Sequence, residues 1–220
     1  MLPKGWTAHS RFHIPLSIDE FSTCQIKKST QLAKLIEKTT LILWDEAPMT
    51  NKYCFEALDK TMQDLKNNYD CPFGGMTVIL GGDFRQILPV VPNGTKENII
   101  DVTINNSYLW QYFRILTLTE NMRLKRNDYN FEEQIEITNF SEWILNIGDG
   151  TINGIKDSEN EDATWIEIPE KYLIQYNKNF VECISTIIYN NFDNNFQNID
   201  NLKQRAIITP RNKTTDEINK

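Results

Sequence analysis

The sequence has few of the side chains that bind zinc in proteins. It contains two histidines, His9 and His13, and four cysteines that are not spaced as CxxC pairs. Structural zinc sites use several such ligands at short spacing, so we do not expect one here. We expect the thiols to be reduced and partly buried, as in an intracellular protein. The cysteines are Cys24, Cys54, Cys71 and Cys183.

Long apolar runs and an excess of positive charge are also missing. No apolar run reaches membrane-spanning length, and the first ten residues, MLPKGWTAHS, lack the apolar core of a signal peptide. The net charge of −7 argues against a strongly basic nucleic-acid-binding surface, although it does not exclude a local basic groove. With 220 residues, of which 40% are hydrophobic, the chain can form one large domain or one and a half ordinary ones.

An apolar run at Leu41–Trp44 ends abruptly in two acids, Asp45 and Glu46. Such a run predicts a buried strand of a parallel sheet, and ligands of open α/β sheets bind beyond the carboxyl ends of the strands. Mg²⁺ prefers one or two carboxylates together with phosphate oxygens, which fits Asp45. Glu46 could orient or deprotonate an attacking water. Many strands end in acids, so this pattern needs support from the rest of the chain.

A second run, residues 76–80, repeats this arrangement and is followed by the turn GGDFRQ. The two glycines allow the backbone to approach a ligand or a neighbouring strand closely. Gln86 could hydrogen-bond a phosphate oxygen or an attacking water. Arg85 could bind phosphate or pair with an acid. A third predicted strand, Phe113–Thr119, precedes Arg123, which could reach a γ-phosphate or form a surface ion pair.

Predicted helices alternate with these strands, which is the α/β pattern. We expect a helix capped by Ser29, a longer one from Thr50 to about Lys66, and a short one within 98–112. A further helix carries Phe140, Trp143, Ile144 and Ile147 at helical spacing and ends at Gly148-Asp149-Gly150. Beyond it we expect a strand at 166–169, a helix at 180–188, a loop at 190–201, a strand at 205–210 and a helix that starts at Thr214.

The first residues combine small polar, basic and aromatic side chains. Thr7, His9, Ser10, Arg11 and Phe12 could contact a phosphate backbone and stack on a base. The alternative is a connection between a strand and a helix that buries Phe12, and spacing alone favours this alternative.

Six segments in this order resemble the petite-integration-frequency (PIF-type) DNA helicases, most closely the branch related to Helitron elements. The resemblance covers essentially the whole chain, and it implies a superfamily-1 motor with two RecA-like domains. Such a motor moves 5′ to 3′ on single-stranded DNA, driven by ATP and Mg²⁺, and unwinds forked DNA. The segments are WTAHSRF, LILWDEAPM, ILGGDFRQILPVV, LTENMR, SEWILNIGDGT and AIITPRN.

The resemblance also assigns roles to individual residues. Asp45 matches the Walker B aspartate that holds Mg²⁺, and Glu46 matches the glutamate that activates water. Gln86 and Arg123 match residues that contact the γ-phosphate. Residues 13–28 match a small insertion near the point of strand separation. The segment that lines the DNA channel is matched by Thr7, His9, Ser10 and Phe12.

The sequence departs from this family at the phosphate loop. No GxxGxGKT motif is present, only 6 residues precede Thr7, and Trp6 stands where a small or basic residue is usual. We therefore expect a fragment that hydrolyses ATP poorly or not at all by itself. It would comprise a partial first RecA-like domain (1–150), a connecting region (151–204) and the truncated start of a second RecA-like domain (205–220).

The resemblance implies a monomeric protein with no membrane partner, located in the nucleus or in the mitochondrion. Its implied roles are DNA repair, recombination and telomere maintenance. Two other interpretations remain open. One is a catalytically inactive DNA-binding or interaction remnant of a mobile-element helicase. The other is an unrelated α/β hydrolase with a metal at Asp45 and Asp83, which fits the acids but not the order of the motifs.

Overall fold

The computed structural model describes residues 5–125, 130–156, 164–175, 179–190, 192 and 196–219. Contacts divide the chain into two units, Met1–Ile152 and Asn153–Lys220. The sequence predicts a boundary at residue 150 and a further one before residue 205. Contacts group everything after Ile152 in one unit, and a separate domain from residue 205 stays a prediction.

The first unit contains a pair of parallel strands, β1 (Leu41–Trp44) and β2 (Thr77–Leu80), with Trp44 opposite Leu80. Both strands are therefore confirmed. Burial differs from the expectation, because only one face of β1 is covered: Ile42 and Trp44 are buried, whereas Leu41 and Leu43 are half exposed. Successive side chains of a strand point to opposite faces, so a strand with a core on one face has alternately buried and exposed residues.

Helix α3 (Lys52–Lys66) provides most of the core of the first unit. Its N-cap is Asn51, whose side chain accepts a hydrogen bond from the Tyr53 amide, and not Thr50 as predicted. The helix predicted to end at about Lys66 is confirmed, and the apolar residues at helical spacing that indicate it, Cys54, Leu58, Met62 and Leu65, are all buried. The buried apolar residues of this helix are Cys54, Phe55, Ala57, Leu58, Met62 and Leu65.

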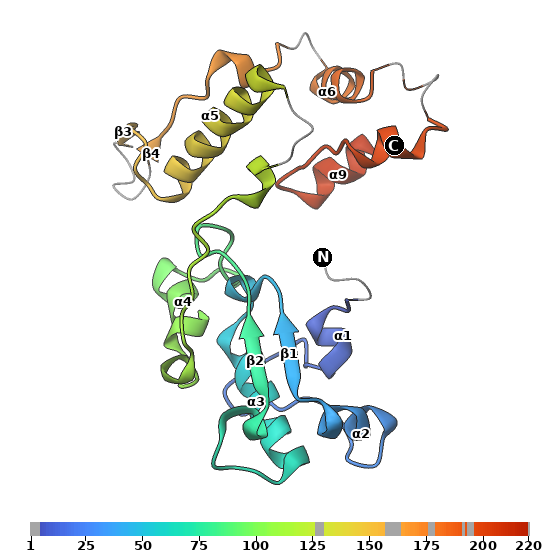
Figure 1. The fold of residues 1–220 in the computed structure, drawn as a ribbon, viewed down its shortest axis with the longest axis vertical. Helices are drawn as coiled ribbons and strands as arrows, with labels where there is room; N and C mark the ends of the chain where they lie inside the picture. The colour runs from blue at the N-terminus through green and yellow to red at the C-terminus, as the bar shows by residue number, and fades with distance from the viewer. Residues whose placement is uncertain are drawn as a thin grey trace. The chain divides into compact units, whose positions relative to one another are not determined.

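Two shorter helices and a long connection lie ahead of β1 (Figure 1). Helix α1 spans Ala8–Phe12 and helix α2 spans Gln31–Lys38. Thr30, one residue after the predicted Ser29, caps α2 by accepting from the Ala33 amide. Between the two helices, the Cys24 amide donates to the Thr61 hydroxyl of α3 at 2.9 Å, which fastens the connection to the core.

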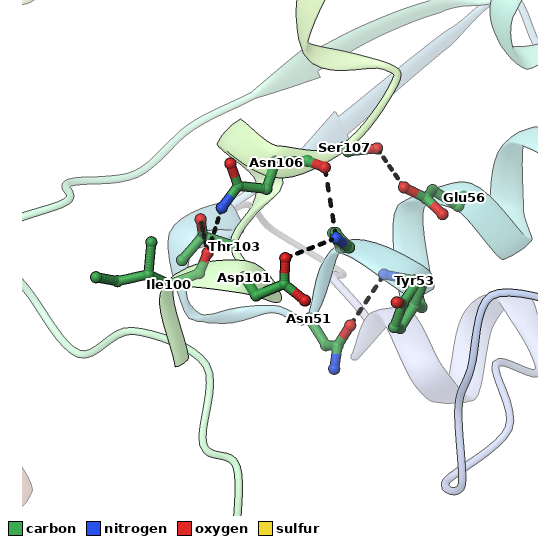
Figure 2. Close-up of polar contacts among 9 residues, drawn as sticks. Asn51, Tyr53, Glu56, Ile100, Asp101, Thr103, Asn106 and Ser107 are labelled. Atoms are coloured by element: carbon green, nitrogen blue, oxygen red, sulfur yellow. Dashed lines mark hydrogen bonds and ion pairs between the residues drawn. The ribbon is translucent and has the colours of Figure 1, made fainter. Parts of the chain in front are cut away.

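The segment after β2 is tied to the N-terminal end of α3 by polar contacts (Figure 2). The Lys52 amide donates to the Val102 carbonyl at 2.7 Å, and the Lys52 ammonium lies 3.7 Å from Asp101. The Ser107 hydroxyl donates to the buried Glu56 carboxylate at 2.7 Å. A buried carboxylate needs such a donor, because leaving it unpaired is costly. This segment contains α4 (Lys96–Asp101) and the 3₁₀ helices η3 (Ile104–Asn106) and η4 (Trp110–Tyr112).

The predicted strand Phe113–Thr119 is wrong. The segment is not part of any strand, and Leu118 is 95% exposed. A strand requires a hydrogen-bonded neighbour, and within the described ranges β1 and β2 pair only with each other. After it come η5 (Met122–Lys125) and α5 (Phe131–Gly148), and α5 confirms the helix predicted around Trp143.

In the second unit, β3 (Ile155–Lys156) pairs antiparallel with β4 (Thr164–Trp165). Helix α6 has the predicted bounds, Phe180–Ile188. The strand predicted at 166–169 is wrong, because the pairing stops at Trp165, and the segment 205–210 is not a strand either. The remaining elements are η6 (Glu170–Tyr172), α8 (Ile199–Lys203) and α9 (Asn212–Ile218). None of the helices that the structure describes is long and apolar enough to span a bilayer.

Candidate functional site

The two acids that follow β1 lie in a tight turn. Glu46 has left-handed backbone angles (φ 55°, ψ 40°), and its amide donates to the Asp45 carboxylate at 3.1 Å. A residue other than glycine is rare in this conformation, which costs on the order of 1–3 kcal/mol. Such strain concentrates at functional sites. Both acids are exposed, and the chain continues into the 3₁₀ helix η1 (Ala47–Met49).

The turn after β2 is bonded directly to this turn. The Gly81 amide donates to the Trp44 carbonyl at 2.8 Å, and the Ala47 amide donates to the Gly81 carbonyl at 2.9 Å. A Cβ atom at Gly82 would lie 2.1 Å from Cδ of Pro48, which is far inside van der Waals contact. At Gly82 the structure therefore shows close approach to a neighbouring segment, whereas a Cβ atom at Gly81 would meet nothing closer than 3.5 Å, and approach to a ligand stays a prediction. Asp45 and the Gly81-Gly82 turn form one surface at the carboxyl end of the sheet.

The rest of this second turn is organised by Asp83. Its carboxylate accepts from the Arg85 amide at 3.0 Å, and its carbonyl accepts from the Gln86 amide at 3.1 Å. The Arg85 guanidinium is ion-paired with Asp83 and with Asp149, which raise its pKa, Asp149 most. Of the two roles open to Arg85, the structure shows pairing with acids. Gln86 is exposed in the turn that follows the strand beside Asp45.

The donor set at this site fits Mg²⁺ with phosphate better than a metal held by protein alone. Nowhere in the described residues do three or more His, Cys, Asp or Glu side chains gather as a metal cluster. Asp45 offers one exposed carboxylate, and Mg²⁺ is commonly bound by one or two carboxylates, water and substrate phosphates. The arrangement therefore suits a metal ion that arrives with a nucleotide.

Arg123, predicted to reach the same site, lies in η5. Its side chain is outside the described part of the structure. Its approach to the γ-phosphate stays a prediction.

The predicted DNA-contacting residues lie on or beside α1. Thr7 occupies the N-cap position and its side chain makes no capping hydrogen bond, and His9 and Ser10 are exposed. The ring of Phe12 is stacked against Trp44, with centroids 6.1 Å apart and an interplanar angle of 17°. One face of Phe12 is thus used for packing, as the alternative interpretation of this segment expects. Contacts of these four residues with DNA stay predictions.

Sequence reasoning missed Asp149 as a partner of this site. The pattern predicts only a helix stop at Gly148-Asp149-Gly150. Asp149 is 64 residues away from Arg85 along the chain, so no local pattern signals the pair. The pattern likewise predicts Trp44 as a strand residue, and it does not indicate that the ring of Phe12 stacks on it.

Comparison with known proteins gives a consistent family. The family model described as PIF1-like helicase matches residues 1–158. The chain is 38% identical over 164 residues to the uncharacterized protein 030L of Invertebrate iridescent virus 6, covering 67% of this chain and 29% of that protein. It is 25% identical over 122 residues to the ATP-dependent DNA helicase Pif1 of a Psychrobacter species, covering 54% of this chain and 18% of that protein.

Solved structures agree with these relatives. The Pif1 helicase from Bacteroides, in complex with ADP-AlF3 and single-stranded DNA, has a TM-score of 0.52 and 27% identity, and the match covers 68% of this chain and 34% of that one. The Pif1 helicase from Candida albicans, at 24% identity and a TM-score of 0.51, supports the fold alone. The predicted fold class, an α/β RecA-like parallel sheet with flanking helices, is therefore confirmed. The chain spans about a third of the length of these structures.

Proposed function

Since the chain belongs to the PIF1-like helicase family, we propose that it forms part of an ATP-dependent DNA helicase. In this proposal the protein couples ATP hydrolysis to 5′-to-3′ movement along single-stranded DNA and to unwinding of forked duplexes. The observation that carries the proposal is the joined pair of turns at the carboxyl end of β1 and β2. They bring an acidic pair, Asp45 and Glu46, beside the turn that contains Gln86.

Each residue of this site has a separate task in the proposal. Asp45 binds Mg²⁺, which would neutralise charge on the phosphates when bound. Glu46 accepts a proton from the attacking water and orients it, and its exposed carboxylate leaves room for that water. Gln86 hydrogen-bonds the γ-phosphate or the water, and Arg123 stabilises charge on the γ-phosphate.

Single-stranded DNA is the proposed track. The Bacteroides helicase that this chain resembles was solved with single-stranded DNA. The exposed polar side chains of Thr7, His9 and Ser10 would contact the phosphate backbone, and Phe12 would support them through its packing on Trp44. A monomeric motor in the nucleus or the mitochondrion, active in repair, recombination and telomere maintenance, completes the proposal.

The test measures ATP hydrolysis by the natural gene product that contains these residues, with and without single-stranded DNA. We expect Mg²⁺-dependent turnover that DNA stimulates. Removing the proposed base by Glu46→Gln is expected to lower turnover by about 10²–10⁴-fold, the usual contribution of general base catalysis. Glu37→Gln, an exposed carboxylate on α2, is the matched control and is expected to leave turnover unchanged.

Turnover that persists in Glu46→Gln would overturn the assignment of the base. A protein that binds single-stranded DNA in a salt-dependent way, with no response to nucleotide, would instead be the inactive remnant. Residues 1–220 contain no glycine-rich phosphate loop, whose backbone amides and lysine hold the phosphates in this class of enzyme. We therefore expect a polypeptide of these residues alone to hydrolyse ATP poorly or not at all.

A further inference from the structure

Arg85 connects the turn after β2 to the end of a distant helix. Its guanidinium lies 3.5 Å from Asp83, in its own turn, and is hydrogen-bonded through Nε to the carboxylate of Asp149. Both acids flank the same cation, so the guanidinium is held from two sides. Gln86 is the next residue along the chain, and the position of its backbone is therefore linked to that of Asp149.

The C-terminal end of α5 packs closely against the Arg85 side chain. A Cβ atom at Gly148 would lie 3.0 Å from Cδ and 3.1 Å from Cβ of Arg85, so the arginine stem is packed directly on the glycine backbone. Gly150, with φ 67°, is the glycine that provides the left-handed turn. The amide of Asp149 donates to the Leu145 carbonyl at 2.9 Å, which fixes Asp149 to the last turn of the helix. Close approach, and not backbone freedom, explains a glycine at position 148.

We propose that Arg85 is a positioning residue that couples the Gln86 turn to the C-terminal end of α5, through Asp149 and Gly148. The inference rests on the proposed function, because Gln86 matters only if a γ-phosphate binds beside it. The first unit ends at Ile152, shortly after Asp149, so the Arg85–Asp149 pair lies close to the point where the chain leaves that unit. A shift of the Gln86 turn on phosphate release either moves the end of α5 or breaks the ion pair.

The location of the pair favours coupling over stability as its role. Arg85 and Asp149 are 46% and 37% exposed, and ion pairs at such positions contribute little to folding. Loss of the pair is therefore expected to change how the motor responds to DNA more than how firmly it is folded.

The experiment compares Arg85→Ala, Asp149→Ala and the double variant in the natural gene product. We expect each single variant to lower the kcat of DNA-stimulated ATP hydrolysis by about tenfold, less than the roughly 10²-fold that a full 1 Å misplacement of a catalytic group can cost. The KM for ATP is expected to stay within about twofold, because no contact with bound nucleotide is removed. The double variant is expected to be no slower than either single variant, because both remove one interaction. Arg85→Lys keeps the charge without the planar fork and is expected to restore part of the rate.

Asp64→Ala is the control, since it removes an ion pair of similar exposure, with Lys28, in the same unit. Additive losses in the double variant, or losses no larger than in Asp64→Ala, would overturn the coupling. The proposed function fails in a different way, through absence of DNA-stimulated turnover in the unmodified protein, and the coupling then fails with it. Normal DNA-stimulated turnover in Arg85→Ala overturns the coupling alone.

Discussion

The first half of the chain and the second half differ in burial, although both contain amphipathic helices. Every buried side chain in the described residues lies between Ile14 and Leu109. From Trp110 to Asn219, no described residue is buried, and Phe131 at the start of α5 is 78% exposed. Apolar periodicity predicted α3, α5 and α6 equally well. It marks the face that a helix can bury, whereas burial itself requires a second layer against that face.

The largest expected effect tests this contrast in folding stability. Leu58→Ala removes a fully buried side chain of α3 and leaves a cavity, so we expect a loss of about 2–5 kcal/mol. Ile144→Ala, at a 48% exposed position of α5, is expected to cost less than about 0.5 kcal/mol. Urea unfolding of the 220-residue chain measures both. Similar losses at the two positions would show that α5 is as closely packed as α3.

A glycine in the site should be the next most sensitive position. Gly82→Ala places a Cβ atom against the Pro48 ring, which cannot rotate away because it is closed onto its own backbone nitrogen. We expect a loss of folding stability of about 1–3 kcal/mol. Gly148→Ala meets the flexible stem of Arg85 instead and is expected to cost less than Gly82→Ala. Thermal unfolding of both variants checks the order. An equal cost would mean that the two turns after β1 and β2 separate easily.

The helix caps should behave differently in the two regions. Asn130 and Glu133 form a capping box at the start of α5, and Asn51 caps α3. Asn130→Ala is expected to remove about 1 kcal/mol from α5 alone, because that helix depends on local interactions. Asn51→Ala is expected to lower global stability by a similar amount. Hydrogen exchange distinguishes the two, and a global effect of Asn130→Ala would contradict the contrast.

Near neutral pH the smallest effect concerns the thiols. Burial raises the pKa of Cys24 and of Cys54 from 9.0 to about 11. Between pH 9 and pH 11 the thiols ionise in the unfolded chain but stay neutral in the folded one. The stabilisation that their burial provides is therefore complete below pH 9 and is lost as the pH rises to 11. In the double variant Cys24→Ala/Cys54→Ala, the free energy of unfolding measured in urea is expected to fall less steeply between pH 9 and pH 11. An unchanged decline would assign it to other groups. At pH 8 a thiol reagent should label the exposed Cys71 long before either buried thiol.

Much of the fold near β1 could be predicted from the sequence, and less of the fold after Leu109. The apolar runs that became β1 and β2 are bounded by polar residues, and their pattern is local. The strands predicted at 113–119 and 205–210 have the same local pattern but no hydrogen-bonded neighbour among the described residues. A strand is a property of a pair, so a single apolar run does not determine one.

The candidate site divides in the same way. The types and order of Asp45, Glu46 and Gln86 were evident from the sequence, because the two acids directly follow one apolar run and Gln86 lies in the polar turn after the next run. Their proximity became visible only in the two hydrogen bonds that join the turns at Gly81. The side chain of Arg85 could equally have faced a phosphate, and only the folded chain shows it between two acids.

The sequence alone determined the types and order of the polar residues at the strand ends and the family to which the chain belongs. It also determined helices α3, α5 and α6, because helical periodicity and caps are encoded within a few turns. Tertiary structure decided which of these helices is buried, which runs became strands and which acids hold Arg85. Those outcomes depend on contacts between residues far apart in the chain, such as Arg85 and Asp149, and no local pattern contains them.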